Sequence, residues 1–259
     1  MTGHVGWTRT LNEDDAMNLL DSVTPGQTMA AFKAQALADL PQAGRDRRVE
    51  LVRLVWQHLV DTRDDVALPS DYLRLFVGAP PPRRTALLWG RFTSTVPLVA
   101  DVLATVIEPT LDRAEQPFAA PDAAVLGQAE WDAALATLLR RGAPRSVIDK
   151  TRSTLQLVLS RCGILVVTGT RSRSTTVRRG DPDGLAFAWL IAQELRTGHH
   201  SEMPERIATA SSYAARLFLP TEDRALACLE AGVRGGVLLR SYLMGSARYH
   251  APPGLGGTD

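Results

Sequence analysis

The chain is poor in cysteine, which excludes several kinds of site. Only two of its 259 residues are cysteines, Cys162 and Cys228, and they do not form a CxxC pair. Two cysteines at this separation provide neither a disulfide framework nor a cysteine-based zinc site. We therefore expect both to be free thiols, with Cys162 as a small apolar residue on the inner side of a helix.

Long uninterrupted apolar runs are also missing. The most apolar stretches cover residues 92–100, 102–107 and 184–193, and Asp101 and Glu108 interrupt the first two. All three are shorter than the roughly 20 residues that a membrane-spanning helix needs. The N-terminal "MTGHVGWTRTLNEDD" lacks the basic-then-apolar pattern of a signal peptide. We expect a cytoplasmic protein without a membrane segment, soluble in the absence of detergent.

Motifs that carry catalysis or bind metals are scarce. The chain has five histidines, and His199 and His200 are its only adjacent pair, with Glu202 as the one nearby acid. Gly235 and Gly236 do not follow a predicted strand, so they do not indicate a nucleotide-binding loop. No Gly-x-Ser-x-Gly, Walker or kinase pattern occurs. We expect a chain that has no enzymatic activity, no cofactor, no metal and no evident small-molecule substrate.

Lysine is nearly absent, so arginine carries most of the positive charge. Lys33 and Lys150 are the only lysines among 29 basic residues, which balance 28 acidic residues to a net charge of +1. Residues 140–180 contain ten basic residues and one acid, Asp149, so this segment carries +9 and the rest of the chain −8. Such an uneven distribution indicates a surface for an anionic partner.

Capping residues and apolar spacing predict a mainly α-helical chain. Asn12, Ser70 and Thr221 stand where helix N-caps are expected, and Pro97 should kink or split a long helical segment. The predicted helices cover residues 12–23, 27–40, 45–62, 70–78, 83–108, 122–141, 146–162, 184–197, 204–218, 222–231 and 236–244.

A proline-containing loop over residues 109–121 is the predicted boundary between two helical lobes. It separates an N-terminal helical domain, residues 1–115, from a C-terminal helical domain, residues 116–250. The last segment, residues 251–259, has the composition of a disordered tail.

One small β-hairpin is predicted within the basic segment. "ILVVT" at residues 164–168 is short, apolar and β-branched, and "TTVRR" at residues 175–179 pairs with it across an arginine-containing turn. Gly163 suits the left-handed position that follows a helix. A helix, a strand, a basic turn and a second strand form the second half of a winged helix-turn-helix. In that arrangement the helix enters a DNA groove and the hairpin contacts phosphates.

The polar face of helix 146–162 and the hairpin arginines supply the candidate DNA-binding residues. Small polar side chains flanked by cations allow close approach to the DNA backbone, and only Gln156 has an obvious bidentate reach to adenine. We therefore expect contacts mainly to phosphates. The candidates are Arg145, Lys150, Ser153, Gln156, Ser160, Arg161, Arg171, Arg173, Arg178 and Arg179.

In the order of its elements the chain resembles the BrxA family, the small helical proteins of BREX phage-defence systems. "GRDRRVELVRLVWQHL" is similar to the early basic helix of the family, and residues 96–103 stand where the family has residues like "YPLLxDFL". "SVIDKTRSTLQLVLSRCGIL" resembles the Ser/Thr-rich helix before the wing, and "YAARLFLPTEDRALACLEAGVRGGVLLRSYLMG" resembles the closing helices. The resemblance covers residues 11–249.

The resemblance implies a two-lobed, mainly α-helical, non-enzymatic protein that binds double-stranded DNA and serves bacteriophage resistance. It also implies a NusB-like first lobe, a winged-helix-like second lobe, and other BREX proteins as partners. Two further interpretations of the basic segment remain open. One is a winged-helix transcriptional regulator, and the other is a helical scaffold whose basic patch binds an acidic protein.

Replacing Arg171 and Arg173 together by alanine should remove about two phosphate contacts. The slope of log affinity for duplex DNA against log salt concentration should become shallower by roughly 1.8, at about 0.9 per contact. Folding should not change, because exposed arginines bury little surface. Fluorescence anisotropy at several salt concentrations measures the slope. Wild-type affinity together with a wild-type slope would show that the hairpin turn is not a contact surface.

Overall fold

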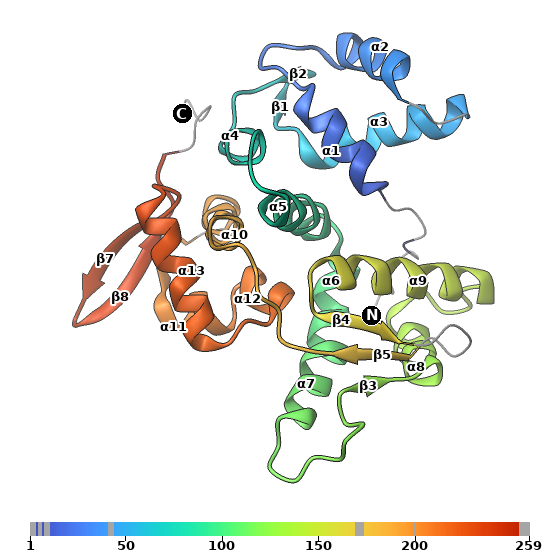
Figure 1. The fold of residues 1–259 in the computed structure, drawn as a ribbon, viewed down its shortest axis with the longest axis vertical. Coiled ribbons are helices and arrows are strands. Elements are labelled where there is room, and N and C mark those ends of the chain that lie inside the picture. The colour runs from blue at the N-terminus through green and yellow to red at the C-terminus, as the bar shows by residue number, and fades with distance from the viewer. Residues whose placement is uncertain are drawn as a thin grey trace.

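The computed structural model describes residues 4, 7, 11–40, 44–168, 174–198 and 200–253. The fold is mainly helical with small antiparallel sheets (Figure 1), which confirms the predicted helical class. Its buried apolar residues form one connected core that extends from Leu11 to Tyr249. The predicted domain boundary near residue 115 stays a prediction, and the core is continuous across it.

The N-terminal region holds three helices and a short hairpin. The side chains of Asn12 and Thr28 accept hydrogen bonds from the backbone at the start of the first and second helices. α1 and α2 both pack on α3, where the rings of Phe32 and Trp56 lie 5.1 Å apart. The elements are α1 (Glu13–Asp21), α2 (Met29–Asp39), α3 (Arg45–Leu59), β1 (Thr62–Arg63) and β2 (Val66–Ala67).

A series of short helices follows. Ser70 caps the first of them, and Pro97 splits the long apolar segment, both as predicted. Pro109 lies in the first turn of α7 and not in a loop, and a wider π-helical turn precedes it. α6, η1 and α7 follow one another without a break, and the π-helical turn lies where Pro109 cannot form the usual i→i−4 hydrogen bond. The elements are α4 (Asp71–Phe76), α5 (Pro81–Ser94), α6 (Pro97–Val102), η1 (Leu103–Ile107) and α7 (Glu108–Ala114).

The bend at Pro97 separates the most apolar helical segments. Among the described residues no single helix is long and apolar enough to cross a membrane. α5 and the segment 97–114 reach the required length and composition only as a pair, and they are bent by 99° relative to each other.

A three-stranded antiparallel sheet and two helices make up the middle of the chain. β5 lies between β3 and β4, and Leu165 of β4 stands opposite Val177 of β5. This hairpin lies where the sequence predicts one, and Gly163 before it has a φ of 82°. The elements are β3 (Val125–Leu126), α8 (Gln128–Leu138), α9 (Arg145–Arg161), β4 (Leu165–Thr168) and β5 (Ser174–Val177).

Two boundaries in this region differ from the prediction. Residues 125–126 form a strand and not the first turn of a helix, because they extend along β5. α9 begins at Arg145 directly after Pro144, so Ser146 lies inside the helix and does not cap it.

The C-terminal region is arranged around α10, which has the predicted bounds. Asp183 caps α10 by accepting hydrogen bonds from the N–H groups of Leu185 and Ala186. Figure 1 shows α10 between α5 and α13, and it packs on both. The elements are α10 (Gly184–Thr197), β6 (Met203–Pro204), α11 (Glu205–Ala210), α12 (Tyr213–Phe218), α13 (Glu222–Arg234), β7 (Leu239–Leu243) and β8 (Ser246–His250).

The prediction of a single β-hairpin is wrong. Besides the β1–β2 and β4–β5 hairpins, residues 239–250 form a longer hairpin where the sequence predicts a helix over residues 236–244. β8 lies between β6 and β7. Met244 and Gly245 both have positive φ, 51° and 82°, as a two-residue type I′ turn requires. Tyr249 fixes β8 on the body, since it is buried and its hydroxyl donates to Glu205 over 2.9 Å.

Replacing Gly232 by alanine should lower the free energy of unfolding by about 1–3 kcal/mol, because overpacking a close helix contact forces the backbones apart. A Cβ at Gly232 of α13 would lie 2.2 Å from the Cβ of Ala188 of α10. Urea unfolding followed by tryptophan fluorescence measures the loss. The double variant Ala188→Gly/Gly232→Ala moves the methyl group from one helix to the other. It should therefore regain part of the lost free energy of unfolding. Equal losses in the single and double variants would contradict the close approach.

Candidate nucleic-acid interface

α9 is the helix on which the candidate site is built. It packs on α8, on β4 and on α5. Figure 1 shows it above the β4–β5 pair, at the edge of the molecule opposite the β7–β8 hairpin. Three neighbours cover a wide arc of α9, which leaves a narrow stripe of its surface exposed.

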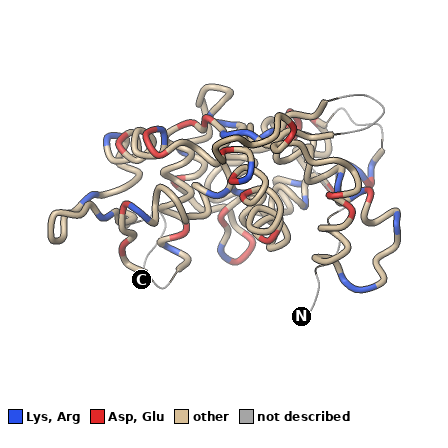
Figure 2. Tube along the Cα trace, turned by 90° about the horizontal axis from the view of Figure 1, so that it is seen from below, with Lys and Arg blue, Asp and Glu red and all other residues tan. Residues whose placement is uncertain are grey.

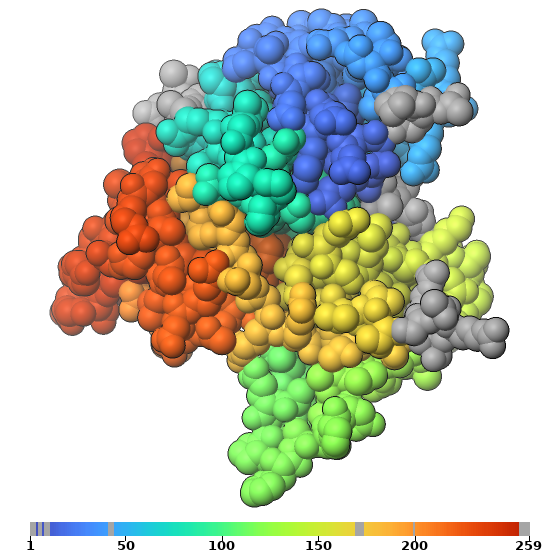
Figure 3. Space-filling model, in the orientation of Figure 1, coloured from blue at the N-terminus to red at the C-terminus, as the bar shows by residue number. Residues whose placement is uncertain are grey.

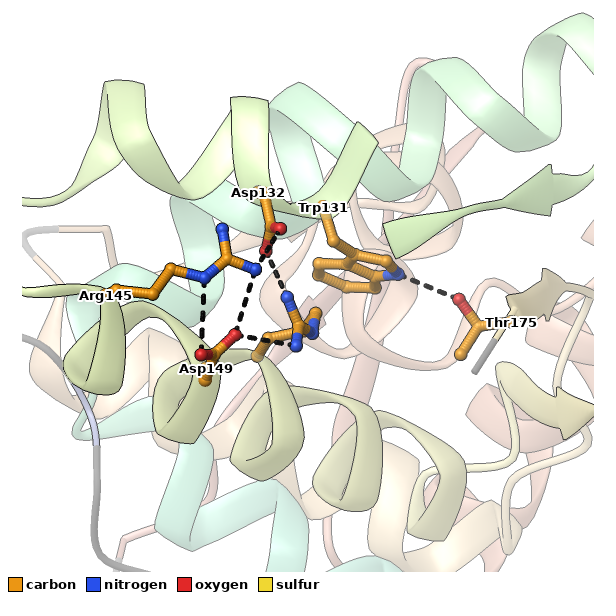
Figure 4. A network of polar contacts seen from close by, with 6 residues as sticks. Trp131, Asp132, Arg145, Asp149 and Thr175 are labelled. Carbon is orange, nitrogen blue, oxygen red and sulfur yellow. Dashed lines mark hydrogen bonds and ion pairs between the residues drawn. The ribbon is translucent and has the colours of Figure 1, made fainter. Parts of the chain in front are cut away.

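Paired charges join α8 to the first half of α9 (Figure 4). Asp132 of α8 accepts from Arg145 over 2.6 Å and also from Arg152. Asp149, one turn into α9, accepts from Arg152 over 2.8 Å and from Arg145 over 3.3 Å. The hydrogen bond that Arg145 donates to Asp132 raises the pKa of Arg145, so this guanidinium remains charged.

A buried hydrogen bond joins α8 to the hairpin. The indole N–H of Trp131 donates to the hydroxyl of Thr175 on β5 over 2.9 Å (Figure 4), and both residues are fully buried. Trp131 therefore fixes the distance between the helix pair and the sheet.

The exposed stripe of α9 contains three of the predicted residues, Lys150, Ser153 and Arg161. Lys150 forms no ion pair within the described part of the chain, whereas Nε of Arg161 lies 3.0 Å from Oε2 of Glu13. Ser153, half-buried, lies between them on the same stripe. Ser146 and Leu157 also belong to this stripe, although they are not among the candidates named from the sequence. They are four and seven residues from Lys150, and this helical spacing would have predicted that they share its face.

Two other predicted residues of α9 do not face solvent. Gln156 is only 3% exposed, and its amide nitrogen has no hydrogen-bond partner among the described residues. The prediction that Gln156 lies on the exposed face is wrong, because three neighbours bury more of α9 than its apolar positions indicate. The hydroxyl of Ser160 is buried as well.

The hairpin arginines differ in their contacts. Arg171 and Arg173 lie outside the described residues. Arg178 is exposed, and its Nε donates to the carbonyl of Gly163 over 2.9 Å. Arg179 donates to both carboxylate oxygens of Glu115, each over 2.6 Å, so it ties the base of the hairpin to the end of α7.

Acidic residues from other parts of the chain fold onto the basic segment. Glu13, Glu115 and Asp132 pair with arginines of residues 140–180, which lowers the net charge of the assembled region from +9 to +6. Figure 2 shows acidic and basic positions close together over much of the molecule. Of these pairs Arg179–Glu115 is exposed on both sides, and exposed ion pairs contribute only about 0–1 kcal/mol, so a phosphate can replace this carboxylate at little cost.

The described residues carry no cluster that resembles a metal centre or a reactive thiol. They contain no group of three or more His, Cys, Asp or Glu side chains that could hold a metal ion. Cys162 and Cys228 are buried free thiols, and burial raises the pKa of Cys228 to about 11 and that of Cys162 further. Thiols with raised pKa values are poor nucleophiles at neutral pH.

Comparison with known proteins assigns no family. No protein-family model, no curated protein and no solved structure matches the chain. The resemblance to the BrxA family therefore stays a prediction from the sequence, and the site is interpreted from its own geometry.

Replacing Thr175 by valine should lower the free energy of unfolding by about 1–3 kcal/mol. The reason is that the buried indole N–H of Trp131 would lose its hydrogen-bond partner. Valine has nearly the same shape, so no cavity contributes. Thr176→Val is the matched control, since Thr176 is the next residue of β5 and is only half-buried. Its effect should stay within about 0.5 kcal/mol. Urea unfolding measures both variants, and equal effects would show that the hydrogen bond contributes nothing.

Proposed function

We propose that the chain binds double-stranded DNA through a winged-helix module and has no enzymatic activity of its own. The observation that supports this most strongly is the order of elements from α6 to β5. A helical segment is followed by a short strand, two helices and a hairpin, and the strands are ordered β3-β5-β4. Winged-helix domains have this same order, with the first strand paired to the returning strand of the hairpin.

The connection between the two helices fits the same arrangement. α8 ends at Leu138 and α9 begins at Arg145, and the left-handed Gly142, with a φ of 80°, turns the chain between them. In a helix-turn-helix the second helix is the one that enters the major groove. We assign that role to α9, and the role of the wing to the β4–β5 hairpin.

The exposed stripe of α9 favours phosphate contacts over base recognition. Lys150 and Arg161 supply positive charge, Ser146 and Ser153 allow close approach, and no long amide side chain faces outward. Binding that is carried by phosphates depends strongly on salt and weakly on sequence. This favours a general duplex-binding protein over a sequence-specific regulator.

The biological setting of the proposal comes from the resemblance to the BrxA family. On that basis the chain is an accessory protein of a BREX-type bacteriophage-resistance system that acts with other proteins of that system. A scaffold that binds an acidic protein is the alternative that the +6 surface also allows, and DNA titrations distinguish the two.

Replacing Lys150 by alanine should weaken binding to unrelated DNA duplexes and make the salt slope shallower by about 0.9, because one phosphate contact is lost. Lys33→Ala is a matched control, since Lys33 is the only other lysine, is exposed, and lies on α2. Its affinity and slope should equal those of the wild type. Fluorescence anisotropy with two unrelated duplexes at several salt concentrations measures both quantities.

Three results would contradict the proposal. The first is absence of duplex binding at low salt, which would favour the scaffold. The second is equal behaviour of the two lysine variants, which would remove α9 from the contact surface. The third is a large difference in affinity between the two duplexes, which would favour a sequence-specific regulator.

A further inference from the structure

The β7–β8 hairpin carries a concentration of exposed apolar side chains. Leu239, Tyr242, Leu243 and Met244 are 51%, 65%, 48% and 98% exposed, and they lie within six consecutive residues. Figures 1 and 3 show the hairpin standing out from the body, on the side away from α9. Exposed apolar side chains gathered in one short segment mark an interaction surface.

β7 is also an open sheet edge. It is the outer strand of the sheet β6-β8-β7, and each of its five residues is exposed. Soluble proteins protect such edges with charge, proline or bulges. β7 has no proline, and its one charged residue, Arg240, is paired with Glu230 of α13. The edge is therefore free to pair with another strand.

The register of the hairpin identifies which backbone groups are available. Leu243 and Ser246 flank the two-residue turn, so they form a hydrogen-bonded pair, and such pairs alternate along an antiparallel ladder. Leu239, Ser241 and Leu243 therefore bond to β8. Arg240 and Tyr242 direct their N–H and C=O groups outward.

We propose that β7 pairs antiparallel with β7 of a second copy of this chain, about a two-fold axis at Ser241. This places Arg240 opposite Tyr242 of the second copy and Tyr242 opposite its Arg240, so every outward N–H and C=O group gains a partner. The two three-stranded sheets then form one sheet, and the contact is the same on both copies, as a two-fold dimer requires.

The side chains agree with this register. Leu239 meets Leu243 of the second copy on one face of the sheet. On the other face Arg240 meets a tyrosine ring, and its guanidinium already lies 5.6 Å from the ring of its own Tyr242. Apolar pairs and cation–aromatic pairs across strands are both stabilising.

Other registers could also pair the outward N–H and C=O groups of β7, but the two nearest ones are less stable. An axis at Arg240 places two arginines directly opposite each other, and like charges in that position destabilise a sheet. An axis at Tyr242 places Arg240 against the turn residue Met244. Only the axis at Ser241 pairs all five residues of β7.

Disulfide trapping tests the register directly. Ser241→Cys should form a covalent dimer under mild oxidation, because residues in such a non-hydrogen-bonded pair have Cα atoms about 4.5 Å apart, within reach of a disulfide. Ser246→Cys is the matched control on β8, exposed but away from the axis. The native cysteines are buried and do not interfere. If Ser241→Cys forms no more dimer on non-reducing gels than Ser246→Cys, the register is overturned.

Introducing a pair of opposite charges tests the same strand pairing at equilibrium. Sedimentation velocity of the full chain should show dimer increasing between about 1 and 100 μM, since the small contact area favours weak association. Leu239→Lys and Leu243→Glu should each raise the dissociation constant about tenfold by removing an apolar cross-strand pair. The double variant should regain dimer, because each lysine then faces a glutamate of the other copy.

Either of two results would overturn the proposal. One is a wild-type chain that stays monomeric throughout this range, which would leave the edge for a strand of another protein. The other is a double variant that dimerises no better than the single variants. Thermal unfolding equal to that of the wild type shows that each variant is folded, as expected for exposed residues. DNA binding is not required for any of these readouts.

Discussion

The close packing of α10 against α5 and α13 is the contact on which the arrangement of the whole chain depends. α10 buries eight of its 14 residues, and glycines allow both neighbours to approach closely. A Cβ on Gly90 of α5 would lie 2.7 Å from Leu190 of α10, and Gly232 of α13 has no side chain above Ala188. α5 in turn contacts α1, α3, α4 and α9. The N-terminal helices and the α8–α9 pair are therefore positioned through α5, and the C-terminal sheet through α13, with α10 packed between the two.

A half-buried arginine adds a polar connection to this centre. Arg91 of α5 donates to both oxygens of Asp61 and to the carbonyl of His58, and its guanidinium lies 4.6 Å from the ring of Tyr72 and 5.8 Å from that of Trp189. Burial alone would raise the pKa of Asp61, but the hydrogen bonds and charge of Arg91 hold it below its usual value. Arg91 therefore connects α3 and α4 to α10, which lies more than 100 residues further along the chain.

The sequence predicted helices well where local chemistry decides them. Asn12, Ser70 and Thr221 all occupy the cap positions that the sequence predicts, and α10 has the predicted bounds. Strand β3 was missed because it pairs with β5, which lies far along the chain, and β7 was missed because its turn lacks the residues that usually indicate a hairpin. β3 has only two residues, and the turn after β7 places Met244, a residue without glycine's freedom, at positive φ.

The candidate site was predictable in its location but not in its details. A run of arginines along the chain shows where positive charge gathers, but not which acids fold onto it, and Glu13 and Glu115 come from distant segments. The burial of Gln156 also depends on distant segments, because α5 and α8 together determine which arc of α9 is covered. Local spacing cannot supply either fact, because both are set by tertiary packing.

The two surfaces proposed for binding lie on opposite sides of the molecule, with α9 and the β4–β5 hairpin at one edge and β7 at the other (Figure 1). A dimer joined at β7 would therefore leave two duplex-binding modules accessible in one particle. Hydrogen–deuterium exchange with and without an excess of unrelated duplex at low salt shows whether residues 125–177 form the DNA-contacting module. We expect added protection in α9, β4 and β5 and none in residues 239–250. Unchanged exchange throughout residues 125–177, with the duplex bound, would contradict this expectation.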